Sequence, residues 1–116
     1  MTITRIGVGP RMSQAVVHAG KVHTAGVVAD SAAGKGVTEQ TADILAQIDA
    51  LLAQAGSDKT KIIKANIWIT DMGRFAEMNA AWDVWVPRGH TPARATVESR
   101  LAGPQYAVEI MVEAAV

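Results

Sequence analysis

Residues 62–70 carry the pattern that most constrains the fold, because their side chains alternate between an apolar face and a second, mixed face. The apolar face holds Ile63, Ala65, Ile67 and Ile69, and the mixed face holds Lys64, Asn66, Trp68 and Thr70. A period of two residues is typical of a β-strand with one buried side. The sequence therefore predicts a sheet whose apolar face is covered by another layer.

Two predicted helices can supply that cover. Residues 38–55 place apolar side chains at helical spacing, at Ile44, Leu45, Ile48, Leu51, Leu52 and Ala55. Gly56 follows this segment, where a C-terminal cap is expected. Residues 73–86 repeat the pattern through Phe75, Met78, Trp82 and Val86, alongside Ala81 and Trp85. Asp71 can cap this second helix, and Pro87 should end it.

Further strands are predicted at residues 14–18, 22–28, 93–99 and 106–114. The resulting order, ββαβαββ, predicts an α+β two-layer sandwich in which both helices cover one face of a mixed or mostly antiparallel sheet. Gly26 lies inside an expected strand, where glycine marks either a bulge or the close approach of a ligand or another backbone. The uncovered face would expose Trp68 and Met111, which predicts an oligomer.

Composition excludes several classes of protein. The 116 residues fit one domain, residues 1–116, and the 11 basic residues balance 11 acidic ones. No net field therefore draws the chain to nucleic acid or to an anionic membrane. Cysteine is absent and the three histidines lack metal-ligand spacing, so we expect no metal. Neither a membrane span nor a signal peptide is evident, which predicts a cytoplasmic protein.

The last two expected strands bring a cation and a carboxylate together. If a turn centred between Ala102 and Gly103 joins them, Thr96 lies opposite Glu109, and Arg94 lies diagonal to Glu109 on the same face. Such a cross-strand pair can be purely structural. Alternatively, the arginine binds a substrate carboxylate bidentately, while the glutamate holds a water molecule and moves its proton.

Several short segments, taken in order and spacing across nearly the whole chain, resemble the RidA/YjgF family. They are Ser13-Gln14-Ala15 with Ala19-Gly20, Thr24-Ala25-Gly26, Glu39-Gln40-Thr41, Phe75-Ala76-Glu77-Met78-Asn79, Pro92-Ala93-Arg94 and Val108-Glu109-Ile110. The segment Trp82-Asp83-Val84-Trp85-Val86 with Gly89-His90 is similar to one branch of the family, which is not the best-studied branch.

This resemblance implies a chorismate-mutase-like α+β fold and a homotrimer with a cleft between each pair of subunits. It implies a hydrolase, an enamine/imine deaminase of the 2-iminobutanoate/2-iminopropanoate type. Such an enzyme converts reactive 2-imino acids, which pyridoxal-phosphate enzymes release, to 2-oxo acids and ammonia. The family's deaminases need no cofactor.

The resemblance also assigns roles to residues. Arg94 stands at the family's carboxylate-binding arginine, and Glu109 stands at its catalytic glutamate. Gly26 and Thr96 stand where backbone groups line the cleft, and Asn79 matches the asparagine of the helix.

Two positions depart from the family pattern. The family often has a cysteine where this chain has Thr96, which is tolerable if only the backbone contributes there. It often has a tyrosine near the cleft mouth where this chain has Met12. The loss of that hydroxyl is expected to change substrate preference or rate.

Three alternatives to a deaminase remain open from the sequence. The same trimeric cleft can hold a 2-oxo acid or another small carboxylate without turnover. An RNA-cleaving or translation-inhibiting protein is a label sometimes attached to the family, and the neutral charge argues against it. A purely structural trimer is the third alternative.

Overall fold

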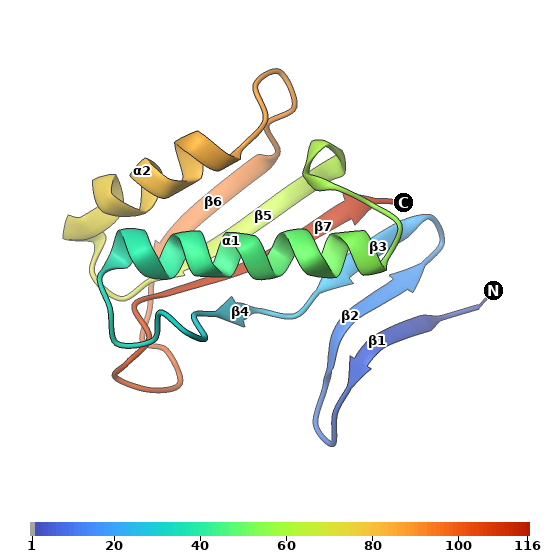
Figure 1. The fold of residues 1–116 in the computed structure, drawn as a ribbon, viewed down its shortest axis with the longest axis horizontal. Coiled ribbons are helices and arrows are strands. Elements are labelled where there is room, and N and C mark those ends of the chain that lie inside the picture. Colours follow the sequence, from blue (N-terminus) through green and yellow to red (C-terminus); the bar gives the residue numbers. More distant parts are fainter. Residues whose placement is uncertain (1) are drawn as a thin grey trace.

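Seven strands form one mixed sheet in the computed structural model, which describes residues 2–116. The strands are β1 Thr4–Val8, β2 Ser13–His18, β3 Lys21–Thr24, β4 Val27–Val28, β5 Ile62–Ile69, β6 Ala93–Glu98 and β7 Val108–Ala115. Two helices, α1 Val37–Gln54 and α2 Phe75–Trp85, lie across one face of the sheet (Figure 1). Short 3-10 turns, η1 Lys59–Lys61 and η2 Met72–Arg74, precede β5 and α2. In this described part of the chain, neither helix is long and apolar enough to span a bilayer.

The layered α+β architecture predicted from the periodicities is confirmed. The core lies between the helices and the sheet, and its fully buried side chains include Ile44, Leu45, Ile48, Leu52, Ile67, Ile69, Met78 and Ile110. The expected apolar face of residues 62–70 was wrong at one position. Ile63 is 46% exposed, and Ile62 is buried in its place, because a register shift between Ile62 and Lys64 changes which side chain faces the core.

The prediction joined two strands into one and missed another. Residues 22–28 form two strands, β3 and β4, because the chain leaves the ladder at Ala25 and Gly26. Strand β1 was not predicted, since its side chains are mostly exposed and show no apolar alternation. Backbone pairing with β2 holds it at the edge of the sheet.

Strands β6 and β7 do not form the expected hairpin, so that prediction was wrong. Strand β5 lies between them, parallel to β6 and antiparallel to β7. The physical reason is that α2 connects β5 to β6 as a parallel crossover, which places β6 on one side of β5 and leaves the other side for β7. Residues 99–107 then carry the chain past β5, a longer path than a typical hairpin loop of about 2–5 residues.

The sheet face opposite the helices has no covering layer among residues 2–116. We call it the open face. The strand registers and the burial pattern place on it Val16, His23, Asn66, Trp68, Val97, Glu109, Met111 and Glu113. His23 Nδ1 lies 3.3 Å from Glu113 Oε1 on this face. The expected exposure of Trp68 and Met111 on an uncovered face is confirmed in that both remain partly accessible.

The loop between β4 and α1 is anchored by Asp43 of α1. Its Oδ2 accepts hydrogen bonds from the backbone N–H groups of Asp30 (2.7 Å) and Ala32 (3.0 Å). Partial burial raises the pKa of Asp43, but these bonds and one from Gln47 outweigh it, so the pKa lies below its usual value of 3.8.

We expect Asp43→Asn to lower the free energy of unfolding by about 1 kcal/mol at neutral pH, because the loop amides lose a charged acceptor. A folded-state pKa below the unfolded value stabilises the fold at higher pH, and this stabilisation is lost as the pH falls through the folded pKa. The difference between variant and wild type in thermal melts should therefore shrink below pH 3.8. Asp83→Asn, on the exposed side of α2, is the matched control. An equal effect of both changes would contradict the anchoring role.

Candidate functional site

Arg94 is a half-buried cation whose partners are all neutral. It lies on β6 and points toward α2, where its Nη1 donates a hydrogen bond of 2.9 Å to Asn79 Oδ1. Its guanidinium carbon lies 5.1 Å from the ring centre of Trp82 and 5.7 Å from that of Phe75. No carboxylate among residues 2–116 forms an ion pair with it. Most of its N–H donors are therefore free to bind an external anion.

Glu109 is a half-buried carboxylate packed against a glycine backbone. It lies on β7 opposite Val28 of β4 and Trp68 of β5. A Cβ atom built on Gly26 would overlap Glu109 Oε2, so the absence of a side chain at Gly26 makes room for this carboxylate. The sequence predicted a bulge at Gly26, or the close approach of a ligand or another backbone; the group that approaches Gly26 is instead an acidic side chain. Within residues 2–116 the Glu109 carboxylate has no hydrogen bond or ion pair, which leaves both oxygens able to accept hydrogen bonds.

The structure does not bring Arg94 and Glu109 together on one face, so that expectation was wrong. Arg94 shares a row with buried Ala65, on the side of the helices, whereas Glu109 shares a row with Trp68, on the open face. Because β5 separates them, their strands lie about 10 Å apart across the sheet, and the registers also offset the two residues by three positions along it. A single chain cannot place both groups on one small ligand.

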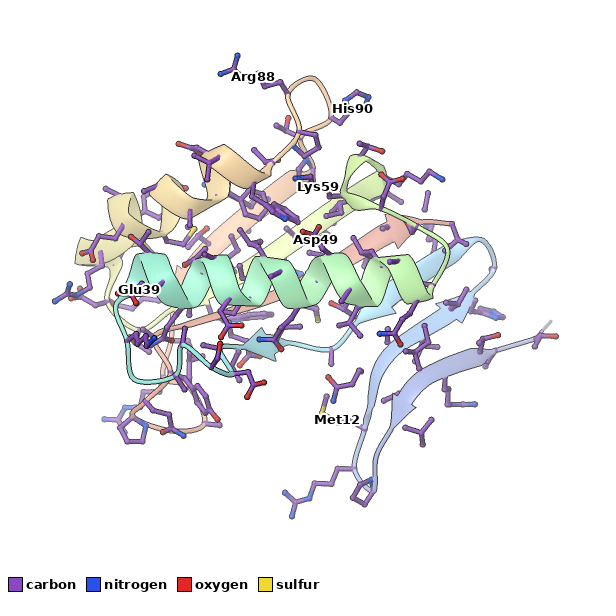
Figure 2. The ribbon with its side chains drawn as sticks, in the orientation of Figure 1. Met12, Glu39, Asp49, Lys59, Arg88 and His90 are labelled. Atoms are coloured by element: carbon purple, nitrogen blue, oxygen red, sulfur yellow. The ribbon has the colours of Figure 1, made fainter. Side chains whose placement is uncertain are left out.

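The other expected site residues fall into two groups. Asn79 and Thr96 lie near Arg94, since Asn79 binds it directly and Thr96 follows it two positions along the same strand face. Thr96 Oγ1 is the one buried side-chain oxygen in residues 2–116 without a hydrogen-bond partner. Met12 lies in the turn between β1 and β2, at the other end of the sheet from β6 (Figure 2), and is 48% exposed. Met12 therefore meets Arg94 only if a second copy brings it there.

Sequence reasoning missed the aromatic contacts of Arg94. Phe75 and Trp82 were expected only as members of an apolar stripe. The available signal was Asn79, a polar residue placed four positions after Phe75 and three before Trp82 in that stripe. These spacings put all three side chains on one face of a helix, so a buried amide there needs a polar partner.

Three surface hollows of about 440, 380 and 320 Å³ lie away from both groups. The largest lies under the loop before β7, where Thr70, Arg100, Pro104 and Tyr106 line it. Arg94 and Glu109 line none of the three, which agrees with a site that one chain leaves incomplete.

Comparison with known proteins identifies the family. The sequence model of the family described as endoribonuclease L-PSP matches residues 2–116. This chain belongs to that family, also called YjgF/RidA. The RutC family protein YoaB of Escherichia coli K12 is 47% identical over 116 residues, covering 100% of both chains. A RutC family protein of Haemophilus influenzae is 42% identical over 112 residues, covering 97% of each chain.

Solved structures of YjgF family members share the fold. A member from Neisseria meningitidis superposes with a TM-score of 0.96 at 50% identity, covering 99% of this chain and 95% of that one. A YjgF/YER057c/UK114 member from Mycobacterium tuberculosis gives 0.90 at 27% identity, covering 99% and 100%. The resemblance noted from the short sequence segments is therefore confirmed, together with the fold that it implied.

Proposed function

We propose that this YjgF family chain hydrolyses 2-imino acids to 2-oxo acids and ammonia. The observation that carries the proposal is the environment of Arg94: a half-buried guanidinium with an amide and two aromatic rings as partners, and no acid paired to it among residues 2–116. A cation held in this way is suited to a bidentate bond with a carboxylate. The 2-imino acids released by pyridoxal-phosphate enzymes carry that carboxylate beside the reactive imine carbon.

The second catalytic group comes from another copy of the chain. Glu109 lies on the open face, which also presents Trp68, Met111 and Val97 and which no other part of residues 2–116 covers. Burial of such a face against another copy removes apolar surface from water. A homotrimer then places Glu109 of one copy near Arg94 of the next, and three equivalent sites result.

The chemistry follows from these positions. Arg94 binds the carboxylate and fixes the imine carbon. The Glu109 carboxylate of the neighbouring copy accepts a proton from a water molecule as the water oxygen bonds to that carbon and the C=N π pair moves to nitrogen. The same carboxylic acid then returns the proton to nitrogen. This gives a carbinolamine, whose hydroxyl proton is then taken by the same carboxylate and passed to the amino nitrogen. The C–N bond breaks as the C=O bond forms, and ammonia leaves.

Subunit mixing tests both the activity and the shared site. An amino-acid oxidase generates 2-imino acids, and a trapping reagent reports how much imine escapes hydrolysis. Arg94→Ala and Glu109→Gln homotrimers should both be inactive. Trimers refolded from equal amounts of the two variants should regain about a quarter of wild-type activity, because a quarter of randomly assembled interfaces pair an intact Arg94 with an intact Glu109.

Two outcomes would contradict the proposal. No recovery on mixing of folded trimers would show that the two residues do not share an inter-subunit site. No imine hydrolysis by wild type would remove the activity itself.

A small-carboxylate binding protein without turnover is the second candidate, because the surroundings of Arg94 suffice for binding on their own. Thermal stabilisation by pyruvate without imine hydrolysis would favour it. The family description mentions an endoribonuclease, but the balanced charge of 11 basic and 11 acidic residues offers little for a phosphate backbone. Salt-dependent RNA binding would reopen that possibility.

Gly26→Ala should impair catalysis while it preserves the fold. The φ angle of Gly26 is not in the left-handed region, so alanine is tolerated by the backbone, but its Cβ would overlap the Glu109 carboxylate. Displacement of that group by about 1 Å is expected to lower kcat roughly 10- to 100-fold with little change in KM. Gly36→Ala is the control, since a Cβ there meets only Glu39 Oε1 at 3.9 Å. Wild-type kcat in Gly26→Ala would separate Glu109 from the reaction.

A further inference from the structure

The side chains that surround Arg94 form a defined cluster on one face of α2. Phe75, Asn79 and Trp82 point from the helix toward β6, where Arg94 projects. Trp82 is 5% exposed and belongs to the core, so its ring is held in place by its neighbours. We call Phe75 and Trp82 the aromatic clamp.

The clamp and Asn79 constrain the guanidinium in complementary ways. The two rings attract the cation through their π faces, and this attraction does not consume an N–H donor. Asn79 Oδ1 accepts a hydrogen bond from Arg94 Nη1, and this bond restricts rotation of the guanidinium group about the Nε–Cζ bond. Arginine has five N–H donors, so enough remain for a bidentate bond to one carboxylate.

Neutral partners also matter for the charge. A carboxylate in place of Asn79 would neutralise Arg94 and compete with a ligand for its donors. Aromatic rings hold the cation without that competition, because they carry no net charge and accept no strong hydrogen bond from the guanidinium. The cluster therefore orients Arg94 while its full charge stays available to an anion.

We propose that Phe75 and Trp82 are positioning residues that hold the Arg94 guanidinium in the orientation that a substrate carboxylate requires. The inference rests on the proposed function for its effect on catalysis. The effect of the two rings on the orientation of Arg94 is independent of that function, because it can be measured without substrate.

The kinetic test compares side chains with and without a ring. Phe75→Leu and Trp82→Leu keep apolar volume near Arg94 but remove the π face, and each should raise KM for the imine about 3- to 10-fold. Trp82→Phe keeps a ring and should recover most of that loss. Val84→Leu is the control on the same helix, because Val84 is 88% exposed, whereas Trp82 is buried beside Arg94.

The second readout is the NMR spectrum of the Arg94 side chain. In the wild type, the Nη groups should give separate signals with ring-current shifts, because rotation about the Nε–Cζ bond is slow. In Phe75→Leu and in Trp82→Leu, faster rotation about this bond should average the separate Nη signals. Trp82 is a core residue, so Phe75, which is only partly buried, keeps the test available if Trp82→Leu fails to fold.

The outcomes separate this inference from the proposed function. An active wild type with unchanged KM in both folded leucine variants would overturn the clamp and leave the deaminase proposal intact. A wild type that neither hydrolyses imines nor binds pyruvate would overturn the proposed function, and the NMR signals would then decide the clamp alone. Averaged Arg94 signals in the wild type would overturn the clamp in either case.

Discussion

Arg94→Ala is expected to lower kcat/KM for 2-imino acid hydrolysis by at least about 100-fold, mainly through KM. Each charge-assisted hydrogen bond to a carboxylate contributes about 1.5–3 kcal/mol, and alanine removes a bidentate pair. Arg94→Lys should not restore activity, since lysine lacks the planar pair of donors and cannot take the place of the guanidinium beside Trp82 and Asn79. Initial rates across a substrate series, with pyruvate binding measured in parallel, check this expectation.

Arg88→Ala is the control for loss of an arginine. Arg88 is exposed in the loop that precedes β6, well away from the contacts of Arg94 (Figure 2). It should leave kcat and KM at wild-type values. Full activity of Arg94→Ala, in a protein that still melts cooperatively, would remove the carboxylate-binding role and with it the proposed site.

Glu109→Gln should produce the opposite kinetic signature. The amide preserves the size of the side chain beside Gly26, but it cannot accept the proton of the attacking water. We expect kcat to fall by about 100- to 10,000-fold, the usual contribution of a general acid–base group, while KM and pyruvate affinity change little. The contrast with Arg94→Ala separates binding from proton transfer.

Glu39→Gln is the matched control for Glu109→Gln. Glu39 is exposed at the start of α1, in the helical layer and not on the open face (Figure 2). Its replacement should leave kcat unchanged. A Glu109→Gln protein with wild-type kcat would show that another group, or water alone, moves the proton, and the mechanism would then reduce to orientation by Arg94.

Local sequence patterns predicted most of the helices and strands, because each of these elements depends on residues that are close in the sequence. The three- and four-residue spacing of Ile44, Leu45, Ile48 and Leu52 specifies one buried helix stripe, and all four are buried. The turn at Gly56 needs a positive φ, which the structure has at 78°. Asp71, expected to cap the second helix, caps η2 instead through a bond of 2.9 Å from the Gly73 N–H group, and α2 begins one turn later at Phe75.

Patterns of apolar residues in the sequence do not reveal features that backbone pairing alone defines. Strand β1 has almost no buried side chains, so no alternation marks it, and only its hydrogen bonds to β2 define it. The register shift near Ile63 has the same origin. An extra residue in a ladder is invisible to a pattern of period two until the partner strand is known.

The sequence by itself determined which residues are candidates for the site: Arg94, Asn79 and Glu109 were identifiable from the family segments, and Gly26 from its place in an expected strand. Only the tertiary structure decided how they are grouped. Strand order depends on contacts between residues far apart in the chain, and the insertion of β5 between β6 and β7 sends Arg94 and Glu109 to opposite faces. That separation, which no local pattern encodes, is the physical reason why the proposed site needs a second copy of the chain.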